Sequence, residues 1–289
     1  MKNKILITGA RGFIGDFLVN LLDAKRFKLN IILNSSTFNL CNWDLVSKTP
    51  KSDLIIHLAA KNFVPDSFLN PLDFYNNNIS STLNILEKAR KDNSRVIFFS
   101  TYVYGIPEYL PVDEKHQSSP LNPYTQSKLI CEQLCMAYNR DFGIPITIFR
   151  PFNVYGPGQN PSFFIPSIIK QINNDFIYLD DSRPKRDFIY IDDVISAIYK
   201  CIINENLSDT FNIYNLGTGI STSVKDVAEL ILEISQSKSK LIFSNKVRKG
   251  EVLETKADIK KIKKELKWNY KTSLRKGIEK IINNNKVAI

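Results

Sequence analysis

Short apolar runs alternate with segments of helical periodicity along the first half of the chain. Five runs have the length and composition of buried parallel strands: residues 3–8, 29–33, 53–60, 95–100 and 144–150. Three segments between them place apolar side chains at helical spacing: residues 13–22, 71–90 and 123–140. This alternation predicts an α/β fold, a doubly wound parallel sheet with helices on both faces. Because the connection between the second and third runs is short, we expect its helix to be reduced or absent.

The pattern changes after residue 150. A loop-rich stretch is followed by shorter elements, with predicted helices at 162–173, 194–203, 223–236, 256–267 and 272–284 and predicted strands at 176–179 and 211–216. No internal repeat or long linker interrupts them. We predict a larger sheet domain at 1–151, with returning segments near 188–217. We predict a smaller C-terminal lobe built from 152–187 and 218–289.

Three glycines stand between the first predicted strand and the first predicted helix. Glycine at the first position allows a tight turn, at the second lets the backbone approach a pyrophosphate, and at the third lets the helix pack close to the strand. The helix N-terminus then faces the anion. The spacing is a weak signal alone, but in this setting it predicts a Rossmann-type dinucleotide-binding domain. We assign to the cofactor site the residues of this loop and helix start: Gly9, Arg11, Gly12, Phe13, Ile14 and Gly15.

The end of the second predicted strand bears on the type of nicotinamide cofactor. A site for NAD usually has Asp or Glu there to bind the ribose hydroxyls, and this chain has Asn34. The missing carboxylate removes repulsion against a 2′-phosphate, and Arg11 could reach that phosphate. The sequence therefore favours NADP(H), but NAD(H) stays open because Asn can also bond the ribose.

Further residues complete the expected cofactor site. Asn39, with its neighbour Leu40, is a candidate adenine contact; the alternative is a simple turn residue. Ala59 and Ala60 end the third predicted strand, where small side chains leave room for a cofactor.

Tyr124 and Lys128 are four residues apart and share one face if their segment is helical. Pro123 suits the first turn of such a helix. A phenol titrates near about 10, and an ammonium group one turn away favours the phenolate, so we expect Lys128 to lower the pKa of Tyr124. A Tyr of this kind can exchange a proton with a substrate. Alone, the pair would more often be a surface Tyr and Lys on an amphipathic helix.

Ser100 ends the fourth predicted strand and Thr101 follows it. A hydroxyl at the carboxyl end of a strand, before a Tyr-Gly loop, can hydrogen-bond a substrate oxygen. The order Ser100, Tyr124, Lys128 after a glycine loop turns the helix face into a candidate catalytic set.

Composition narrows the function classes. The chain has 289 residues, 43% of them hydrophobic and 24% charged, which is ordinary for a globular protein. The net charge of +10 raises nucleic-acid binding, but the Lys residues are spread out and no recognition motif accompanies them. A positive surface would still attract an anionic small molecule.

The four Cys and two His lack metal-ligand spacing, so we expect no metal. Without a long apolar run or a signal peptide, we expect a cytoplasmic protein that does not contact a membrane.

The chain resembles the extended short-chain dehydrogenase/reductase superfamily, in its NAD-dependent epimerase/dehydratase branch that acts on nucleotide sugars. The resemblance runs nearly end to end. The stretches that carry it are the glycine loop at 9–15, His57-Leu58-Ala59-Ala60, Ser100 to Gly105, Tyr124 to Lys128, Phe149 to Gly158, Arg186 to Val194 and Tyr214 to Gly219.

The resemblance implies a bound nicotinamide cofactor, a nucleoside-diphosphate sugar as substrate and a homodimer through the helices at 71–90 and 123–140. It implies that Tyr124 is the acid/base, that Lys128 lowers its pKa and holds the nicotinamide ribose, and that Ser100 shares the substrate oxygen. It also implies substrate-binding positions: Ser100, Thr101, Asn153, Arg186, Arg248 and Glu251. Two Arg side chains can meet a diphosphate with forked donors.

The resemblance leaves the reaction open among several classes. The 4,6-dehydratases carry an acid directly after the Ser/Thr position, where this chain has Thr101 and Tyr102, so a dehydratase is disfavoured. The compact chain and Asn34 favour a reductase of a 4-keto-6-deoxy sugar carried by dTDP or GDP, of the kind used in making surface polysaccharides and lipopolysaccharide. The alternative is a 4-epimerase with tightly bound NAD. A non-catalytic nucleotide-binding sensor is disfavoured because such proteins usually lose the Tyr or the Lys.

Overall fold

The computed structural model describes residues 4–32, 38–204, 207, 211–247 and 250–287. The chain divides into two compact units. Unit 1 comprises Met1–Gly105, Gln117–Pro151 and Ala197–Tyr214, and unit 2 comprises Ile106–His116, Phe152–Ser196 and Asn215–Ile289.

Unit 1 is built on a six-stranded sheet in the order β2-β1-β3-β4-β5-β9. Its strands are β1 (Lys4–Thr8), β2 (Lys28–Ile32), β3 (Leu54–His57), β4 (Arg95–Phe99), β5 (Ile146–Pro151) and β9 (Phe211–Leu216). The pairs from β2 through β5 are parallel. The chain passes from β2 back across β1 to β3, so the order reverses between β1 and β3. The loops that follow β1 and β3 therefore run in opposite directions. Open α/β sheets bind their ligands in the crevice between two such loops, at the carboxyl ends of the strands.

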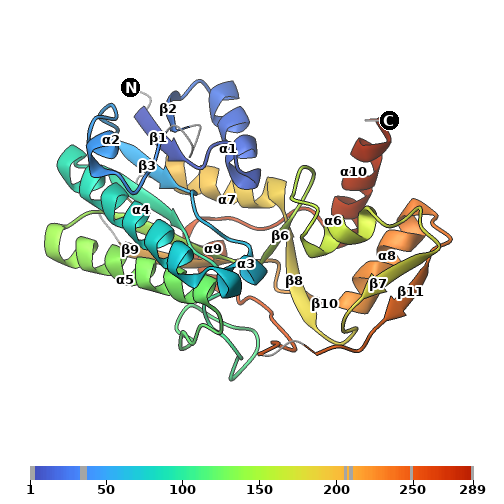
Figure 1. Ribbon diagram of the computed structural model, residues 1–289. Helices are drawn as coiled ribbons and strands as arrows, with labels where there is room; N and C mark the ends of the chain where they lie inside the picture. Colours follow the sequence, from blue (N-terminus) through green and yellow to red (C-terminus); the bar gives the residue numbers. More distant parts are fainter. Residues whose placement is uncertain (1–3, 33–37, 205–206, 208–210, 248–249, 288–289) are drawn as a thin grey trace. The chain divides into compact units, whose positions relative to one another are not determined.

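Helices cover both faces of this sheet (Figure 1). They are α1 (Phe13–Ala24), α2 (Trp43–Ser47), α4 (Pro71–Asp92), α5 (Pro123–Phe142) and the later part of α7 (Ile191–Ile203). The short helix α3 (Val64–Leu69) lies against α4 and α5. On one face, side chains from α2, α4 and α5 pack on alternate strand residues such as Leu6, Ile55 and Phe98. On the other face lies α1, with Phe27 just beyond its end and its ring edge-on to Tyr199 of α7. The predicted doubly wound α/β fold is confirmed.

Local sequence fixes the start and end of α5. Pro123 stands in its first turn, and the Asn122 side chain accepts from the Thr125 N–H at 2.9 Å in a capping box. Gly143 ends the helix in the left-handed conformation at φ 68°. Tyr124 and Lys128 therefore occupy the first two turns of a well-defined helix. The expected reduction of the helix between β2 and β3 is also seen, since α2 has five residues.

Unit 2 contains a three-stranded sheet, order β10-β8-β6, and a two-stranded sheet of β11 and β7. Its strands are β6 (Asn153–Tyr155), β7 (Phe176–Leu179), β8 (Lys185–Tyr190), β10 (Ser221–Ser223) and β11 (Lys240–Phe243), and its helices are the start of α7 with α6 (Phe164–Ile169), α8 (Val224–Ser235), α9 (Lys260–Glu265) and α10 (Leu274–Val287). Within this unit the Asp187 carboxylate accepts from Thr218 N–H and hydroxyl, Gly219 N–H and Ala257 N–H. Asp187 thus joins β8 to two later segments.

Two predicted helices are shorter than expected. The segment predicted at 256–267 is helical only in α9, because the backbone of Ala257 pairs in a β-bridge with Val112. The segment predicted at 162–173 is helical only in α6 and continues as turns. The short helix α3 was not predicted, since Pro65 and a length of six residues hide its periodicity. None of the helices in the described part of the chain is long and apolar enough to span a membrane.

Candidate active site

The glycine loop after β1 is tightly packed against its own backbone and against the loop after β3. Gly9 has φ +72°, and a Cβ there would lie 2.7 Å from the Ala59 nitrogen. A Cβ on Gly15 would lie 2.1 Å from the Gly9 oxygen. No side chain fits at either position. The two loops at the sheet's reversal point therefore form one backbone cradle, as the glycine spacing predicts.

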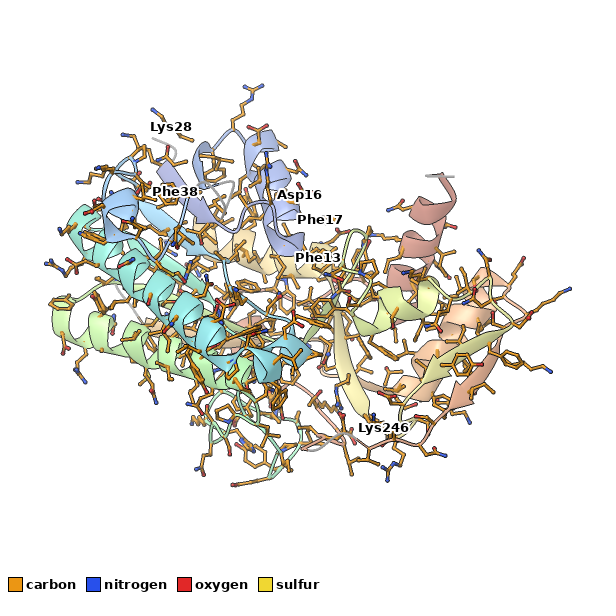
Figure 2. The ribbon with its side chains drawn as sticks, viewed as in Figure 1. Phe13, Asp16, Phe17, Lys28, Phe38 and Lys246 are labelled. Atoms are coloured by element: carbon orange, nitrogen blue, oxygen red, sulfur yellow. The ribbon has the colours of Figure 1, made fainter. Side chains whose placement is uncertain are left out.

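Helix α1 begins directly at this cradle. Its cap residue is Gly12, which offers no side-chain acceptor to the N–H groups of the first turn. Such N–H groups, with the helix dipole, suit an anionic phosphate. Phe13 stands at the first position, and its ring lies 6.1 Å from that of Phe17 one turn on (Figure 2). The cradle and this bare helix start fit the pyrophosphate of a dinucleotide.

Further residues predicted to bind the cofactor are Arg11, Asn34, Asn39 and Leu40. Arg11 is exposed in the loop. Asn39 is exposed, and its side-chain oxygen accepts from the Cys41 N–H at 2.9 Å, as a turn residue does. Leu40 packs partly against the core, and its carbonyl accepts from Asn84. Asn34 lies outside the described residues.

His57 at the end of β3 ties the sheet to α4 beneath the cradle. Its Nδ1 lies 2.7 Å from the Thr8 hydroxyl, and its Nε2 lies 3.2 Å from the Thr82 hydroxyl. The Thr8 hydroxyl also accepts from the Ala59 N–H at 3.3 Å. Burial, and secondly the charge of Lys128, lower the pKa of His57 to about 3. His57 is therefore neutral near pH 7, and its hydrogen bonds link Thr8 of β1 to Thr82 of α4.

Ser100 and Thr101 follow β4 directly. Ser100 is 4% exposed, and its buried Oγ has no hydrogen-bond partner among the described residues. A buried polar atom without a hydrogen bond destabilises the folded protein. Its backbone N–H donates to Phe149 at 2.8 Å, which fixes the residue to β5. The Ser100 hydroxyl is thus a rigidly held polar group available to a ligand oxygen.

The expectation that Lys128 lowers the pKa of Tyr124 is wrong for this structure. Tyr124 keeps part of its surface exposed, but the surrounding protein desolvates its hydroxyl and raises the pKa of Tyr124 to about 12. A hydrogen bond from the Thr101 side chain opposes this shift. Removal of water destabilises the charged phenolate more than the Thr101 hydrogen bond stabilises it. Tyr124 is accordingly a protonated phenol near pH 7, held beside the residue that follows Ser100.

Lys128 is buried at 3% exposure one turn beyond Tyr124. Its Nζ lies 4.1 Å from the centroid of the Phe98 ring, a cation–π contact. Burial lowers its pKa, and the nearby Cys131, Cys135 and Glu132 oppose that shift. Unit 1 thus places the predicted catalytic residues directly after β4 and in the first two turns of α5.

Unit 2 by itself contains a cavity of about 340 Å³. It gathers three of the predicted substrate residues, Asn153, Arg186 and Glu251. Arg186 pairs with Glu251 and donates to the carbonyls of Val252 at 2.6 Å and Lys185 at 2.9 Å. The loop at 251–252 is therefore held against β8 by the guanidinium. Arg248 lies outside the described residues.

Several lining residues of this cavity were not predicted. The rings of Phe164 and Phe188 stack at 6.0 Å, and Lys246, labelled in Figure 2, adds a cation. Phe164 gave no signal in the sequence because a lone aromatic on a short helix is usually a core residue. Lys246 is one of many Lys in its region. An aromatic surface with cations beside it can stack a base and attract phosphates.

A model of the NAD dependent epimerase/dehydratase family matches residues 5–217. The chain belongs to this family. It is therefore an enzyme of a family of nucleotide-sugar epimerases, dehydratases and reductases, as the motifs predict.

Relatives of the chain align over nearly its whole length. A Methanocaldococcus jannaschii protein described as a candidate UDP-glucose 4-epimerase is 35% identical, covering 96% of this chain and 97% of that protein. The GDP-6-deoxy-D-talose 4-dehydrogenase of Aggregatibacter actinomycetemcomitans is 34% identical, covering 97% of each. The structure of RMD from Pseudomonas aeruginosa, complexed with NADPH, superposes with a TM-score of 0.90 at 25% identity over 100% of both chains.

Proposed function

We propose that this enzyme is a nicotinamide-dependent reductase of the 4-keto group of a nucleoside-diphosphate 6-deoxy sugar, carried by dTDP or GDP. The observation that carries the proposal is the buried Ser100 hydroxyl, which has no hydrogen-bond partner among the described residues and precedes Thr101, whose side chain bonds Tyr124. Reduction of a ketone needs a proton donor at the developing alkoxide, and a phenol with a pKa of about 12 is protonated at neutral pH. Asn34, in place of an acid, favours a reductase over an epimerase with tightly bound NAD.

The roles of the side chains follow from their contacts. When bound, the nicotinamide supplies a hydride to the carbonyl carbon. The Tyr124 hydroxyl gives its proton to the carbonyl oxygen, and the Ser100 hydroxyl donates a hydrogen bond to the same oxygen. The Thr101 side chain, already bonded to Tyr124, stabilises the phenolate that remains. The Lys128 ammonium, one turn away, adds a favourable positive charge.

We assign binding of the cofactor to unit 1 and binding of the nucleotide sugar to unit 2. The backbone cradle of Gly9 and Gly15 supports the first assignment. The cavity of unit 2 supports the second, since Arg186 and Lys246 can attract a diphosphate and the aromatic residues offer a stacking surface. Asn153 adds an amide that can bond ribose or phosphate.

The proposal favours NADPH. Asn34 puts no carboxylate against a 2′-phosphate, and the exposed Arg11 could pair with one. The NADPH complex of the Pseudomonas protein supports this choice. NADH remains the second cofactor to be tested.

A 4-epimerase is the second candidate, favoured by the 35% identity to the Methanocaldococcus protein. A 4,6-dehydratase is disfavoured, because Thr101 stands where those enzymes carry an acid. We also propose a homodimer, supported by exposed apolar side chains on the two long helices, including Leu83 on α4 and Met136 on α5. Light scattering after gel filtration tests it against a monomer of 33.1 kDa.

The reaction is tested with a panel of dTDP-, GDP- and UDP-linked sugars, including 4-keto-6-deoxy forms, with and without NADPH or NADH. One molecule of reduced cofactor consumed per sugar supports the reductase. Interconversion of two sugars with no net oxidation of cofactor would establish the epimerase instead. No conversion of any sugar would point to a non-catalytic protein.

A further inference from the structure

A buried ion pair lies one helical turn beyond Lys128. Glu132 follows Lys128 by four residues on α5, and Arg150 is near the end of β5. The two residues are 1% and 5% exposed. The guanidinium donates from Nε to both carboxylate oxygens at 3.1 Å and from Nη2 to Oε2 at 2.6 Å. No step of the proposed reaction uses this pair.

The pair is held from a third side by Tyr104. The Arg150 guanidinium carbon lies 4.9 Å from the centre of that ring. Its Nη1 is buried without a hydrogen-bond partner among the described residues. A buried ion pair adds little net stability compared with apolar residues of similar size. Stability alone therefore does not explain why Glu132 and Arg150 are charged.

Lys128 is the neighbouring buried cation. Among the residues that the structure describes, none places a carboxylate oxygen within 4.0 Å of its Nζ, which lies over Phe98 instead. Glu132 is at the i+4 position, where a helix readily forms an ion pair. Both Glu132 oxygens are occupied by Arg150. The carboxylate that could capture Lys128 is therefore already held.

We propose that Arg150 is a positioning residue that holds the Glu132 carboxylate and so keeps Lys128 from pairing within α5. The ammonium then stays available to Tyr124 and to a bound ligand. This inference rests on the role of Lys128 in the proposed function. The charged or titratable groups that interact with Lys128 are His57 from β3 and Cys131, Glu132 and Cys135 from α5. Tyr124 lies one turn away on α5, and Arg150 of β5 lies behind Glu132.

Three variants separate this role from a merely structural one. In Arg150→Met, Glu132 is released to pair with Lys128, so the pKa of Lys128 rises by about one unit. In Glu132→Gln, the carboxylate is lost and the pKa of Lys128 falls. In the double variant Glu132→Gln/Arg150→Met, Arg150 has nothing left to hold, so the pKa returns towards that of the wild type. The titration is followed by NMR of the protein carrying ¹³Cε-labelled Lys, with the Lys128 signal identified by its absence in Lys128→Met.

Turnover gives the second readout. We expect Arg150→Met to lower kcat at least tenfold and the double variant to recover most of it, since Arg150 is dispensable without Glu132. The matched control is Asp92→Asn, which breaks the buried Lys88–Asp92 pair of α4, whose atoms are 2.9 Å apart. It should lower stability and leave the Lys128 titration unchanged.

Shifts of the Lys128 pKa in the same direction in both single variants would overturn the inference. So would a double variant no better than Arg150→Met. If the single variants do not fold, the double variant decides, because a large loss of kcat or a displaced Lys128 titration there contradicts the dispensability of Arg150. Failure of every sugar in the panel would refute the proposed function alone, while the NMR titration would still decide the role of Arg150.

Discussion

Tyr124 is the residue on which the proposed chemistry depends. Tyr124→Phe removes the proton donor but keeps the ring, which lies edge-on to Phe74 at 6.5 Å. We expect turnover to fall by about 10²–10⁴-fold, with affinity for NADPH nearly unchanged. Tyr138→Phe, on the same helix, is the matched control and should keep full turnover. Near-normal turnover of Tyr124→Phe, measured by NADPH oxidation, would remove Tyr124 from the mechanism.

Burial of His57 makes the free energy of unfolding depend on pH. The unfolded His binds a proton below about pH 6.5, whereas burial keeps folded His57 neutral down to about pH 3. The unfolded state therefore binds more protons in this window, and the free energy of unfolding falls as the pH falls from 6.5 towards 3. The slope contributed is about 1.4 kcal/mol per pH unit at most. Urea unfolding across this range should show a shallower pH dependence for His57→Gln than for the wild type. Equal slopes would contradict it.

The sequence identified residue types better than it identified their environments. Ser100, Tyr124 and Lys128 were proposed from their order and spacing, which can be read directly along the chain. The predicted direction of the Tyr124 pKa shift was wrong, because desolvation depends on neighbours that only folding brings close. The Glu132–Arg150 pair was missed for the same reason, since its members come from a helix and a strand 18 residues apart.

The glycine loop and α1 form the element that we expect to bind the cofactor. In Gly15→Ala, the new Cβ would meet the Gly9 oxygen at 2.1 Å, so the loop must move away from its cradle. We expect the dissociation constant for NADPH, measured by calorimetry or fluorescence, to rise at least tenfold, an effect of about 1.4 kcal/mol or more.

The matched control for this prediction is Gly143→Ala, at the end of α5. Gly143 has φ +68° and no atom within 4 Å of a built Cβ, so the change strains only the backbone. It should lower stability by about 1 kcal/mol and leave NADPH affinity unchanged. Equal NADPH affinity in Gly15→Ala and the wild type would show that the loop does not bind the cofactor.

Long, strongly patterned elements were the ones predictable from the sequence. Helices α1, α4, α5 and α8 and strands β1 and β4 lie within a few residues of the predicted ranges. Strands β6, β10 and β11 were not predicted, and neither was β8, whose residues the sequence assigned to a loop and the approach to a helix. The pairing of β6 and β10 with β8, and of β11 with β7, joins distant parts of the chain, which a local pattern cannot reveal.

The whole molecule combines a family assignment with an open choice of reaction. The net charge of +10 suits an anionic nucleotide sugar, and the family match covers residues 5–217. Relatives of nearly equal identity act as a 4-dehydrogenase or are described as a candidate 4-epimerase, so similarity alone does not choose between them. The choice of a reductase over an epimerase depends instead on Asn34, and Thr101 in place of an acid disfavours a dehydratase.

The most direct test follows one hydrogen atom. The enzyme is given a 4-keto-6-deoxy nucleotide sugar with NADPH deuterated at the transferable position of the nicotinamide, and the product is examined by NMR and mass spectrometry. The reductase proposed here places one deuterium on C4 of every product sugar and consumes one NADPH for each. No deuterium on C4 and no consumption of NADPH would contradict the proposal. Inversion at C4 of a nucleotide sugar that carries a C4 hydroxyl, without added NADPH, would establish an epimerase.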